Sequence, residues 1–177
     1  MVGCRDFLPT SSLEPVSTTA QPRSVMSKAE STTHEFESKS SAGTIAIGRK
    51  LAELLTPPRL LILRGDLGAG KTTLVKGIAA ALGAAEPDEV TSPTFTLIHE
   101  YAGKLDGRPV KLLHLDLYRL DAERQLDTLG LEEMRTPDAI LLVEWGEKFK
   151  SIRKHADGEI VVTSEGGDAR KIVVTLN

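Results

Sequence analysis

The segment GDLGAGKT, from Gly65 to Thr72, matches the pattern G-x-x-x-x-G-K-[ST] at every fixed position. It follows the apolar run LLIL at 60–63 and precedes TTLVKGIAAALG at 72–83, whose apolar residues recur at helical spacing. Glycines allow backbone angles that turn successive N–H groups toward one concavity, and the next helix begins with unpaired N–H groups and a positive dipole end. A strand, this loop and a helix in succession predict a phosphate-binding loop.

The residues of this loop suit the phosphates of a nucleotide. The ammonium of Lys71 would reach the β- and γ-phosphates, and the hydroxyl of Thr72 would bind a Mg²⁺ ion that bridges them. A tight turn without a ligand is the alternative, but a chance match to the whole pattern in this context is rare. The residues predicted to contact the nucleotide are Gly65, Asp66, Leu67, Gly68, Ala69, Gly70, Lys71, Thr72 and Thr73.

The base of the nucleotide is inferred by elimination. A guanine-binding GTPase would carry an N-K-x-D segment, whereas the only asparagine of this chain is Asn177. The segment DTLG at 127–130 matches the short D-x-x-G pattern of GTPases, but it ends a polar helical segment instead of following a strand. We interpret DTLG as a helix end and expect the nucleotide to be ATP.

Two acidic residues compete for the role of holding the metal ion. Asp116 ends the alternating segment KLLHLD, and Glu144 follows the wholly apolar segment AILLV. Burying a carboxylate behind such a run is costly unless a metal ion or a cation pairs with it, which favours Glu144 as the acid on the metal side. The alternative for either residue is a solvated carboxylate at the end of a strand.

Other polar and aromatic residues are less decisive. The segment SPT at 92–94 lies where P-loop hydrolases often place residues that contact the γ-phosphate, so Thr94 could bind Mg²⁺ or position water, although an ordinary strand entry fits equally well. His99 and His114 lie in predicted strands without metal-ligand spacing, which favours a structural role. Trp145 is interpreted as a core residue, with a partner-facing anchor as the alternative.

Hydrophobic periodicity divides most of the chain into interleaved helices and strands. Helices are expected at 42–55, 72–83 and 121–134, and strands at 60–63, 94–101, 110–118, 139–145, 159–164 and 170–176. The strands on either side of 102–109 are predicted to form a hairpin. This order predicts an α/β fold, namely a P-loop NTPase-like three-layer domain with a mixed parallel and antiparallel central sheet.

The composition of the chain indicates where the folded domain begins and in which cellular compartment the protein is expected. Residues 1–41 are rich in Ser, Thr, Pro and Glu, so we expect a disordered N-terminal extension before an ATPase domain at 42–177, with Met26 as a possible true start and a targeting or regulatory tail as the alternative. Cys4 is the only cysteine, and no apolar run approaches the roughly 20 residues that span a bilayer. A formal net charge of −3 argues against binding nucleic acid by bulk electrostatics. We therefore expect a soluble cytoplasmic protein without membrane or DNA partners.

Five segments carry a resemblance to a known family: GDLGAGKTT, VTSPTFTLIHEY, LLHLDLYRL, LGLEE and ILLVEWGEKF, in this order. Together they resemble the TsaE (YjeE) family, the small P-loop ATPases of bacterial tRNA threonylcarbamoyladenosine synthesis, over residues 41–177. The resemblance implies an ATPase that uses ATP and Mg²⁺ and binds the TsaB–TsaD pair. TsaD transfers the threonylcarbamoyl group to the adenosine beside the anticodon of ANN-decoding tRNAs, and hydrolysis is expected to reset the assembly. Contact with tRNA is expected only through that complex.

The resemblance also assigns roles to individual residues. The positions that match the family's phosphate, metal and acidic motif residues are Lys71, Thr72, Asp116 and Glu144. It further places Thr44, in the first helix, and Arg170, before the last strand, near the nucleotide. Gly146 stands where the family often has a proline, which should loosen the turn after Glu144 without removing an acid.

The resulting hypothesis is a slow ATPase that partner proteins stimulate. Lys71, Asp116 and Glu144 would be catalytic, and Thr72 and Glu144 would hold Mg²⁺. Arg119 is a candidate arginine finger. Two other functions stay open: a P-loop small-molecule kinase, for which the segment 121–135 is an unconvincing lid because it is net acidic, and a nucleotide-gated assembly module without significant turnover.

Overall fold

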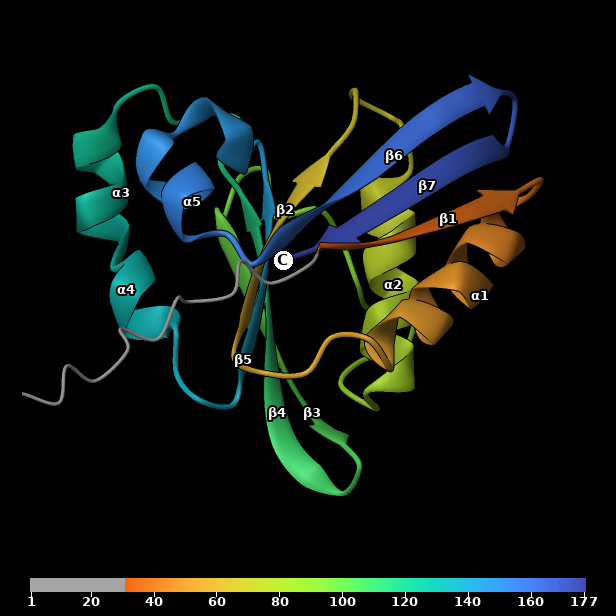
Figure 1. The fold of residues 1–177 in the computed structure, drawn as a ribbon, viewed down its shortest axis with the longest axis horizontal. Helices are drawn as coiled ribbons and strands as arrows, with labels where there is room; N and C mark the ends of the chain where they lie inside the picture. Colours follow the sequence, from red (N-terminus) through yellow and green to blue (C-terminus); the bar gives the residue numbers. More distant parts are fainter. Residues whose placement is uncertain (1–30) are drawn as a thin grey trace, which may run out of the picture.

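The computed structural model describes residues 31–177, which fold into seven strands, five α-helices and one 3₁₀-helix (Figure 1). In chain order these are β1 (Thr32–Ser38), α1 (Ser41–Ala52), β2 (Arg59–Arg64), α2 (Lys71–Ala81), β3 (Ile98–Leu105), β4 (Arg108–Asp116), α3 (Glu123–Leu129), α4 (Leu131–Met134), β5 (Ala139–Glu144), η1 (Gly146–Lys148), α5 (Lys150–His155), β6 (Gly158–Gly166) and β7 (Ala169–Leu176).

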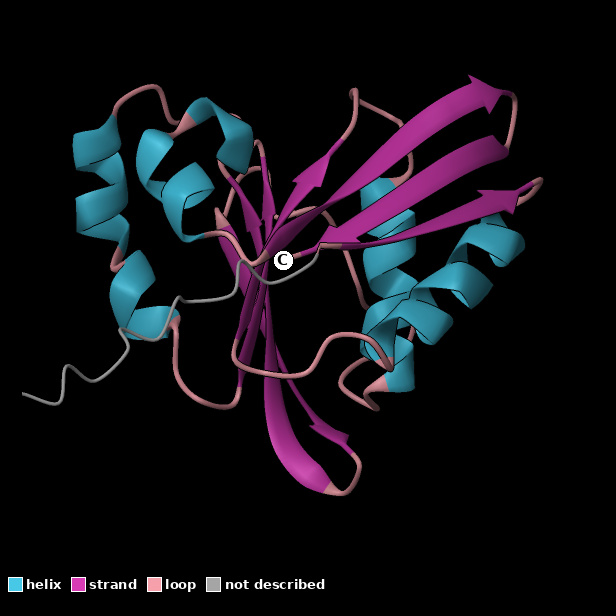
Figure 2. Ribbon diagram, in the orientation of Figure 1, coloured by secondary structure: helices cyan, strands magenta, loops and turns pink. Residues whose placement is uncertain are grey.

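One mixed sheet holds all seven strands, in the order β1-β7-β6-β2-β5-β4-β3. The central strand β2 runs parallel to β5 and β6, and β4 runs parallel to β5. The remaining pairs, β3–β4, β6–β7 and β1–β7, are antiparallel. Helices α1 and α2 cover one face of the sheet, and α3, α4 and α5 cover the other (Figure 2). The predicted three-layer α/β fold with a mixed sheet is confirmed.

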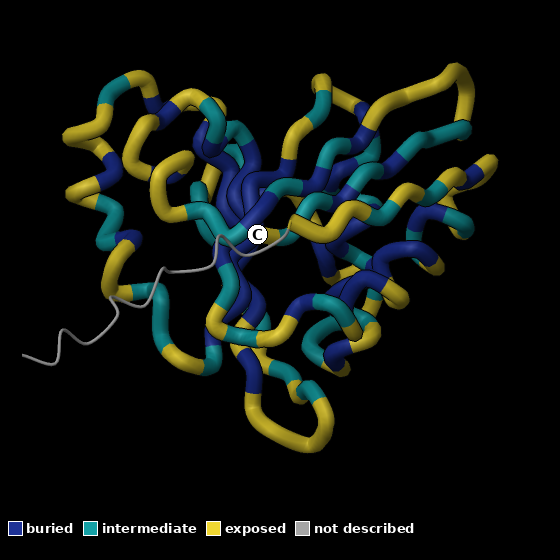
Figure 3. Tube along the Cα trace, in the orientation of Figure 1, coloured by how far each residue is buried: buried dark blue, intermediate teal, exposed yellow. Residues whose placement is uncertain are grey.

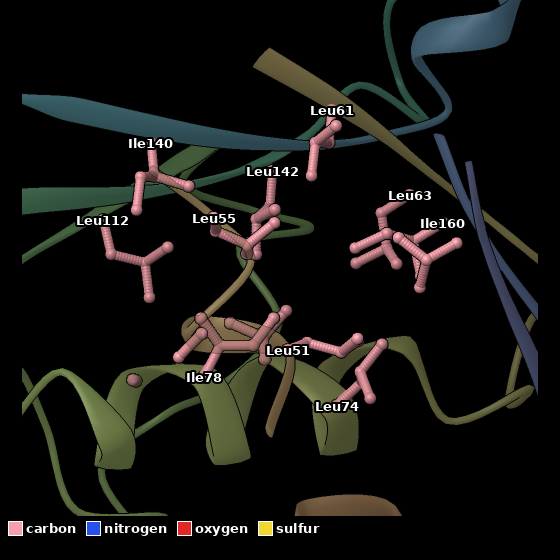
Figure 4. Packing of buried hydrophobic residues seen from close by; sticks show 14 of the residues in the cluster. Leu51, Leu55, Leu61, Leu63, Leu74, Ile78, Leu112, Ile140, Leu142 and Ile160 are labelled. Atoms are coloured by element: carbon pink, nitrogen blue, oxygen red, sulfur yellow. The ribbon is translucent and has the colours of Figure 1, made fainter. Parts of the chain in front are cut away.

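The core lies on both faces of the sheet, which explains why β2 and β5 are apolar without alternation. Leu61 and Leu63 of β2 point to the face that α1 and α2 cover, where Figure 4 shows them opposite Leu51, Leu74 and Ile78. The intervening residues of β2, Leu60 and Ile62, pack into the second core under α3 and α5. Burial is therefore concentrated in the central strands, and the exposed residues lie mainly on the outer helices and hairpin tips (Figure 3).

Two glycines let α1 and α2 cross in direct backbone contact. A Cβ atom on Gly77 would lie 2.1 Å from the carbonyl oxygen of Ile45, and one on Gly48 would lie 2.3 Å from the carbonyl oxygen of Leu74. No real Cβ atom tolerates such distances, so the crossing requires glycine on both helices. This contact holds α2, which begins at the glycine-rich motif, firmly against α1.

The predicted domain boundary at residue 42 is wrong for the described part of the chain. Thr32–Ser38, which we expected to belong to a disordered extension, forms β1 and pairs with β7 along seven residues. Strand β1 is stabilised by contacts with distant residues, because it hydrogen-bonds to the edge of β7 and packs Phe36 against the core. Its own composition does not indicate a strand. The predictions of disorder for 1–30 and of a start at Met26 lie outside the described residues.

Other elements differ from the predictions in extent. The β3–β4 hairpin is confirmed, but its turn is the pair Asp106–Gly107 and β3 begins only at Ile98. The helix expected at 121–134 is divided by Gly130, which has φ 71° and ends α3. Helices η1 and α5 were not predicted. Within residues 31–177, no helix has the length and apolar character needed to cross a bilayer.

Candidate nucleotide-binding site

The glycine-rich loop connects the central strand β2 to helix α2. Strand β2 ends at Arg64, and α2 begins at Lys71 with Gly70 at the N-cap position. Gly70 has φ 102°, a left-handed conformation that a residue with a side chain rarely adopts. It also has no side-chain oxygen to cap the helix. The N-terminal N–H groups of α2 are thereby turned toward the loop, in the arrangement that binds anions.

Lys71 is held at the floor of this loop. Its Nζ atom donates hydrogen bonds to the carbonyl oxygens of Gly65, at 2.8 Å, and Asp66, at 3.1 Å. It also lies 3.4 Å from Oε2 of Glu144 and 5.3 Å from the centre of the Trp145 ring. The residue is only 6% exposed. The motif lysine is therefore a buried, positioned cation with a carboxylate beside it.

The two candidate acids are neighbours on adjacent strands. Asp116 ends β4, Glu144 ends β5, and the register of this parallel pair sets them directly opposite each other. Both side chains point to the α1–α2 face, because they continue the alternation of Leu112 and Leu142. The carboxyl ends of β4 and β5 thus bring both acids beside the start of α2, and both are buried.

Each acid has its own set of partners. Oδ2 of Asp116 accepts hydrogen bonds from Oγ1 of Thr94, at 2.7 Å, and Oγ of Ser92, at 3.4 Å. Its Oδ1 accepts one from the backbone N–H of Tyr118. Glu144 instead contacts Lys71 and, through Oε1, Nε2 of His114 at 2.8 Å. Asp116 is therefore linked to the 92–94 segment, and Glu144 to the motif lysine.

These groups surround a cleft of about 490 Å³, a volume in the range of small-molecule sites. The cleft is lined by Leu67, Gly68, Gly70, Lys71, Thr72, Thr73, Ser92, Thr94, Asp116, Tyr118, Glu144 and Trp145. Three predicted loop residues, Gly65, Asp66 and Ala69, do not line it. Gly65 and Asp66 supply the carbonyl groups that hold Lys71, and Ala69 is buried in the core.

The two residues that the resemblance placed near the nucleotide, Thr44 and Arg170, do not line the cleft. Nε of Arg170 comes within 3.2 Å of the position that a Cβ atom on Gly70 would take. Arg170 pairs with Ser38 across the β1–β7 register, and Oγ of Ser38 lies 2.7 Å from Oγ1 of Thr44. Arg170 thus contacts the loop without lining the cleft, and Thr44 is connected to the loop only through Ser38 and Arg170.

Two other arginines, Arg119 and Arg64, have their charges engaged outside the cleft. The guanidinium of Arg119 stacks on the ring of the exposed Phe95, 4.3 Å from its centre, and Arg119 does not line the cleft. Arg64 bonds to Glu159 at 3.0 Å, and this hydrogen bond raises the pKa of the guanidinium. No arginine is among the residues lining the cleft in the described part of the chain.

The oxygen-bearing side chains of the cleft fit Mg²⁺. The hydroxyl of Thr72 and the carboxylates of Asp116 and Glu144 are hard oxygen ligands, and Mg²⁺ typically takes one or two carboxylates and completes its shell with phosphates and water. Across 31–177, no group of three or more His, Cys, Asp or Glu residues could enclose a metal ion unaided. The donor set therefore suits a metal ion that arrives with a phosphate ligand.

Three residues at the site were not assigned there from the sequence. Trp145 and Tyr118 line the cleft with their rings 5.3 Å apart, and Trp145 adopts φ 61°, which is unusual for an aromatic residue. His114 contacts Glu144, although we interpreted it as structural. Its position two residues before Asp116 was an available signal, because residues i and i+2 of a strand share a face.

A parallel central strand, a glycine-rich turn into a helix and two strand-end carboxylates define the P-loop NTPase-like class of α/β proteins. Residues 38–172 match the family model described as "Threonylcarbamoyl adenosine biosynthesis protein TsaE". The chain therefore belongs to the TsaE family, whose role is in tRNA threonylcarbamoyladenosine biosynthesis.

Individual relatives agree with this family. The tRNA threonylcarbamoyladenosine biosynthesis protein TsaE of Haemophilus influenzae is 40% identical over 120 residues, which cover 64% of this chain and 71% of the relative. The TsaE protein of Bacillus subtilis is 40% identical over 132 residues, covering 75% of this chain and 78% of the relative. The crystal structure of Bacillus subtilis YdiB is similar in fold, with a TM-score of 0.60, 33% identity, and coverage of 83% and 87%.

Proposed function

We propose that this chain binds ATP with Mg²⁺ and hydrolyses it to ADP and phosphate in the service of tRNA threonylcarbamoyladenosine synthesis. One observation carries the proposal. Lys71 and Thr72, at the start of α2, share a cleft with two carboxylates at the carboxyl ends of β4 and β5. Because phosphate, metal ion and attacking water must meet in phosphoryl transfer, this combination supports hydrolysis better than simple anion binding.

The side chains divide the work as follows. The N-terminal N–H groups of α2 and the ammonium of Lys71 bind the phosphates. Thr72 and Glu144 would hold Mg²⁺, which would supply positive charge to offset that of the phosphates. Asp116 orients the attacking water. Its hydrogen bonds to Thr94 and Ser92 also connect the carboxylate to the segment before β3, so that a change at the γ-phosphate can alter this segment.

The proposed partner is the TsaB–TsaD complex, and tRNA is reached only through it, in the cytoplasm. Membership of the TsaE family supports a role beside other proteins of tRNA threonylcarbamoyladenosine biosynthesis, and the choice of TsaB–TsaD rests on what the resemblance to this family implies. A need for a partner agrees with the cleft, where none of the arginines among residues 31–177 lines the site to stabilise charge during transfer. We therefore expect slow hydrolysis by the isolated protein and stimulation by the partner.

The test is ATP hydrolysis by the purified protein, alone and with TsaB–TsaD. We expect stimulation by the partner and its loss in Lys71→Ala and Glu144→Ala. Trp145, the only tryptophan of the chain, lies 5.3 Å from the Lys71 ammonium, so its fluorescence reports nucleotide binding separately from turnover.

Other outcomes would select another function. Nucleotide binding without turnover under every condition would favour a nucleotide-gated assembly module. Transfer of phosphate to a metabolite in the absence of the partner would favour a small-molecule kinase. A free enzyme that already turns over faster than about 10 per second, a typical rate for a complete enzyme, would contradict stimulation by a partner.

A further inference from the structure

The imidazole of His114 lies completely buried beneath the cleft. It belongs to β4, two residues before Asp116 and on the same face of the sheet. Its Nε2 atom is 2.8 Å from Oε1 of Glu144, whereas its Nδ1 atom has no hydrogen-bond partner among residues 31–177. The aliphatic neighbours of His114 on this face, Leu112 and Leu142, show that the position could hold an apolar residue. Packing alone therefore does not explain why this position holds a histidine.

The asymmetry of the two ring nitrogens selects one tautomer. A proton on Nδ1 would be buried without an acceptor, and the lone pair of Nε2 would then face the Glu144 carboxylate. A proton on Nε2 instead gives a hydrogen bond to a charged acceptor and leaves only a lone pair unpaired, which is the less costly arrangement. His114 is therefore the donor and Glu144 the acceptor.

This hydrogen bond determines how Glu144 can use its two oxygens. Oε1 is bound to His114, below the cleft, and Oε2 faces the ammonium of Lys71 at 3.4 Å. Rotation about the terminal carboxylate bond would break the contact with the imidazole. One oxygen is thus fixed in the core while the other is presented to the cleft, where the phosphates and Mg²⁺ would lie.

We propose that His114 is a positioning residue for Glu144, which fixes the orientation of this carboxylate toward the reacting phosphate. The inference rests on the proposed ATPase function, because positioning matters only if Glu144 takes part in hydrolysis. Partners of this kind, which orient a ligand without touching the substrate, typically change activity by about 10- to 100-fold when they are lost.

The experiment compares three substitutions that differ in the donor they leave. His114→Gln places an amide N–H near the position of Nε2, whereas His114→Asn places one near Nδ1, and His114→Leu removes both. We expect His114→Asn and His114→Leu to lower kcat by about 10- to 100-fold while nucleotide affinity, measured by Trp145 fluorescence, and KM change by less than about threefold. His114→Gln should retain most of kcat. Thermal unfolding of each variant shows whether it is folded.

Equal losses in His114→Gln and His114→Asn, or no loss in His114→Leu, would overturn the positioning role. A parallel rise in KM would do so as well, because it indicates a binding or structural effect. The ¹⁵N signals of His114, assigned by their absence in His114→Gln, supply a readout that does not need turnover. A proton on Nδ1 in the wild type contradicts the inference directly. Failure of the wild type to hydrolyse ATP instead contradicts the proposed function.

Discussion

At the scale of single residues, the most consequential contact is the buried pair formed by Lys71 and Glu144. Their side chains are 6% and 5% exposed, and the charged atoms lie 3.4 Å apart. Removing both charges from such a pair is often tolerated, whereas removing one leaves the other buried without compensation. The pair therefore makes the motif lysine important for stability as well as for the proposed binding of phosphate.

We expect Lys71→Met to lower the free energy of unfolding by about 3 kcal/mol, the lower end for a broken buried ion pair, because the cleft admits water to the remaining carboxylate. The double variant Lys71→Met with Glu144→Gln should recover most of this loss, since the glutamine carries no charge and can still accept from His114. Urea unfolding of the wild type, both single variants and the double variant gives the coupling energy. Additive effects of the two substitutions would mean that the charges do not interact.

At the scale of elements, the helices and strands that could be predicted from the sequence are those whose formation depends on residues close together in the chain. Strand β2, helix α2 and strand β5 carry continuous apolar or helical patterns, and all three form near the predicted residues. Strand β1 was missed because its stability comes from the edge of β7, which has no signature within TTHEFES itself. Helix α5 was missed because Ile152 is its only buried residue. These elements depend on contacts with residues distant in the sequence.

The close crossing of α1 and α2 leads to a prediction about Gly77, which lies outside the glycine-rich motif. Gly77→Ala should lower the free energy of unfolding by about 3 kcal/mol, near the upper end for overpacking, because the clash is with the backbone oxygen of Ile45, which no rotamer change can relieve. This loss would exceed the gain of up to about 1 kcal/mol from replacing glycine by alanine within a helix. Lys76→Ala, on the same helix, is the control and should change stability by less than about 0.5 kcal/mol. Denaturant unfolding measures both, and a neutral Gly77→Ala would mean that the helices can separate at no cost.

A single carboxylate connects α3 to α5. Glu123, in the first turn of α3, accepts hydrogen bonds at 2.6 Å from the backbone N–H of Lys150 and from Oγ of Ser151. The hydrogen bond from Ser151 is the main cause that lowers the pKa of the carboxyl below its usual range. Because the pKa is lower in the folded protein, this contact stabilises the fold above the ordinary glutamate pKa of about 4.3 and is lost as pH falls through the lower folded value.

Glu123→Gln should therefore unfold at a lower temperature than the wild type at pH 7, and the difference should shrink as the pH falls below about 4.3. Thermal unfolding of both proteins between pH 7 and pH 3 measures this difference. In a Ser151→Ala background the effect of Glu123→Gln should be smaller, because the principal donor is gone. A difference that stays constant across this range would show that the charge of Glu123 does not contribute.

At the scale of the whole molecule, the site is assembled from segments that only the fold brings together. The loop residues Lys71 and Thr72 were predictable because they belong to one contiguous motif. The strand-end positions of Asp116 and Glu144 were predictable too, but their direct pairing depends on the register of β4 and β5. The contact of His114 with Glu144 depends on the same register, which no single segment of the sequence contains.

The glycine-rich loop is also connected to β1, the edge strand of the sheet, through Arg170. Strand β1 pairs with β7 along seven residues, and its last residue, Ser38, contacts Thr44 and lies opposite Arg170. Arg170 in turn packs against Gly70 at the start of α2. The path from β1 to the loop is therefore short, so the edge strand should affect both the stability of the sheet and the binding of nucleotide.

A chain that begins at Lys39, and so lacks β1, should be less stable by about 3 kcal/mol than one that begins at Met26, because seven cross-strand pairs worth about 0.2–1 kcal/mol each are lost. The newly exposed edge of β7 should also favour self-association, since unpaired strand edges recruit other strands. Denaturant unfolding and size-exclusion chromatography measure these effects, and Trp145 fluorescence should report weaker ATP binding. Equal stability and affinity of the two chains would mean that β1 is dispensable, and the domain would then begin at α1, as the composition of the sequence first suggested.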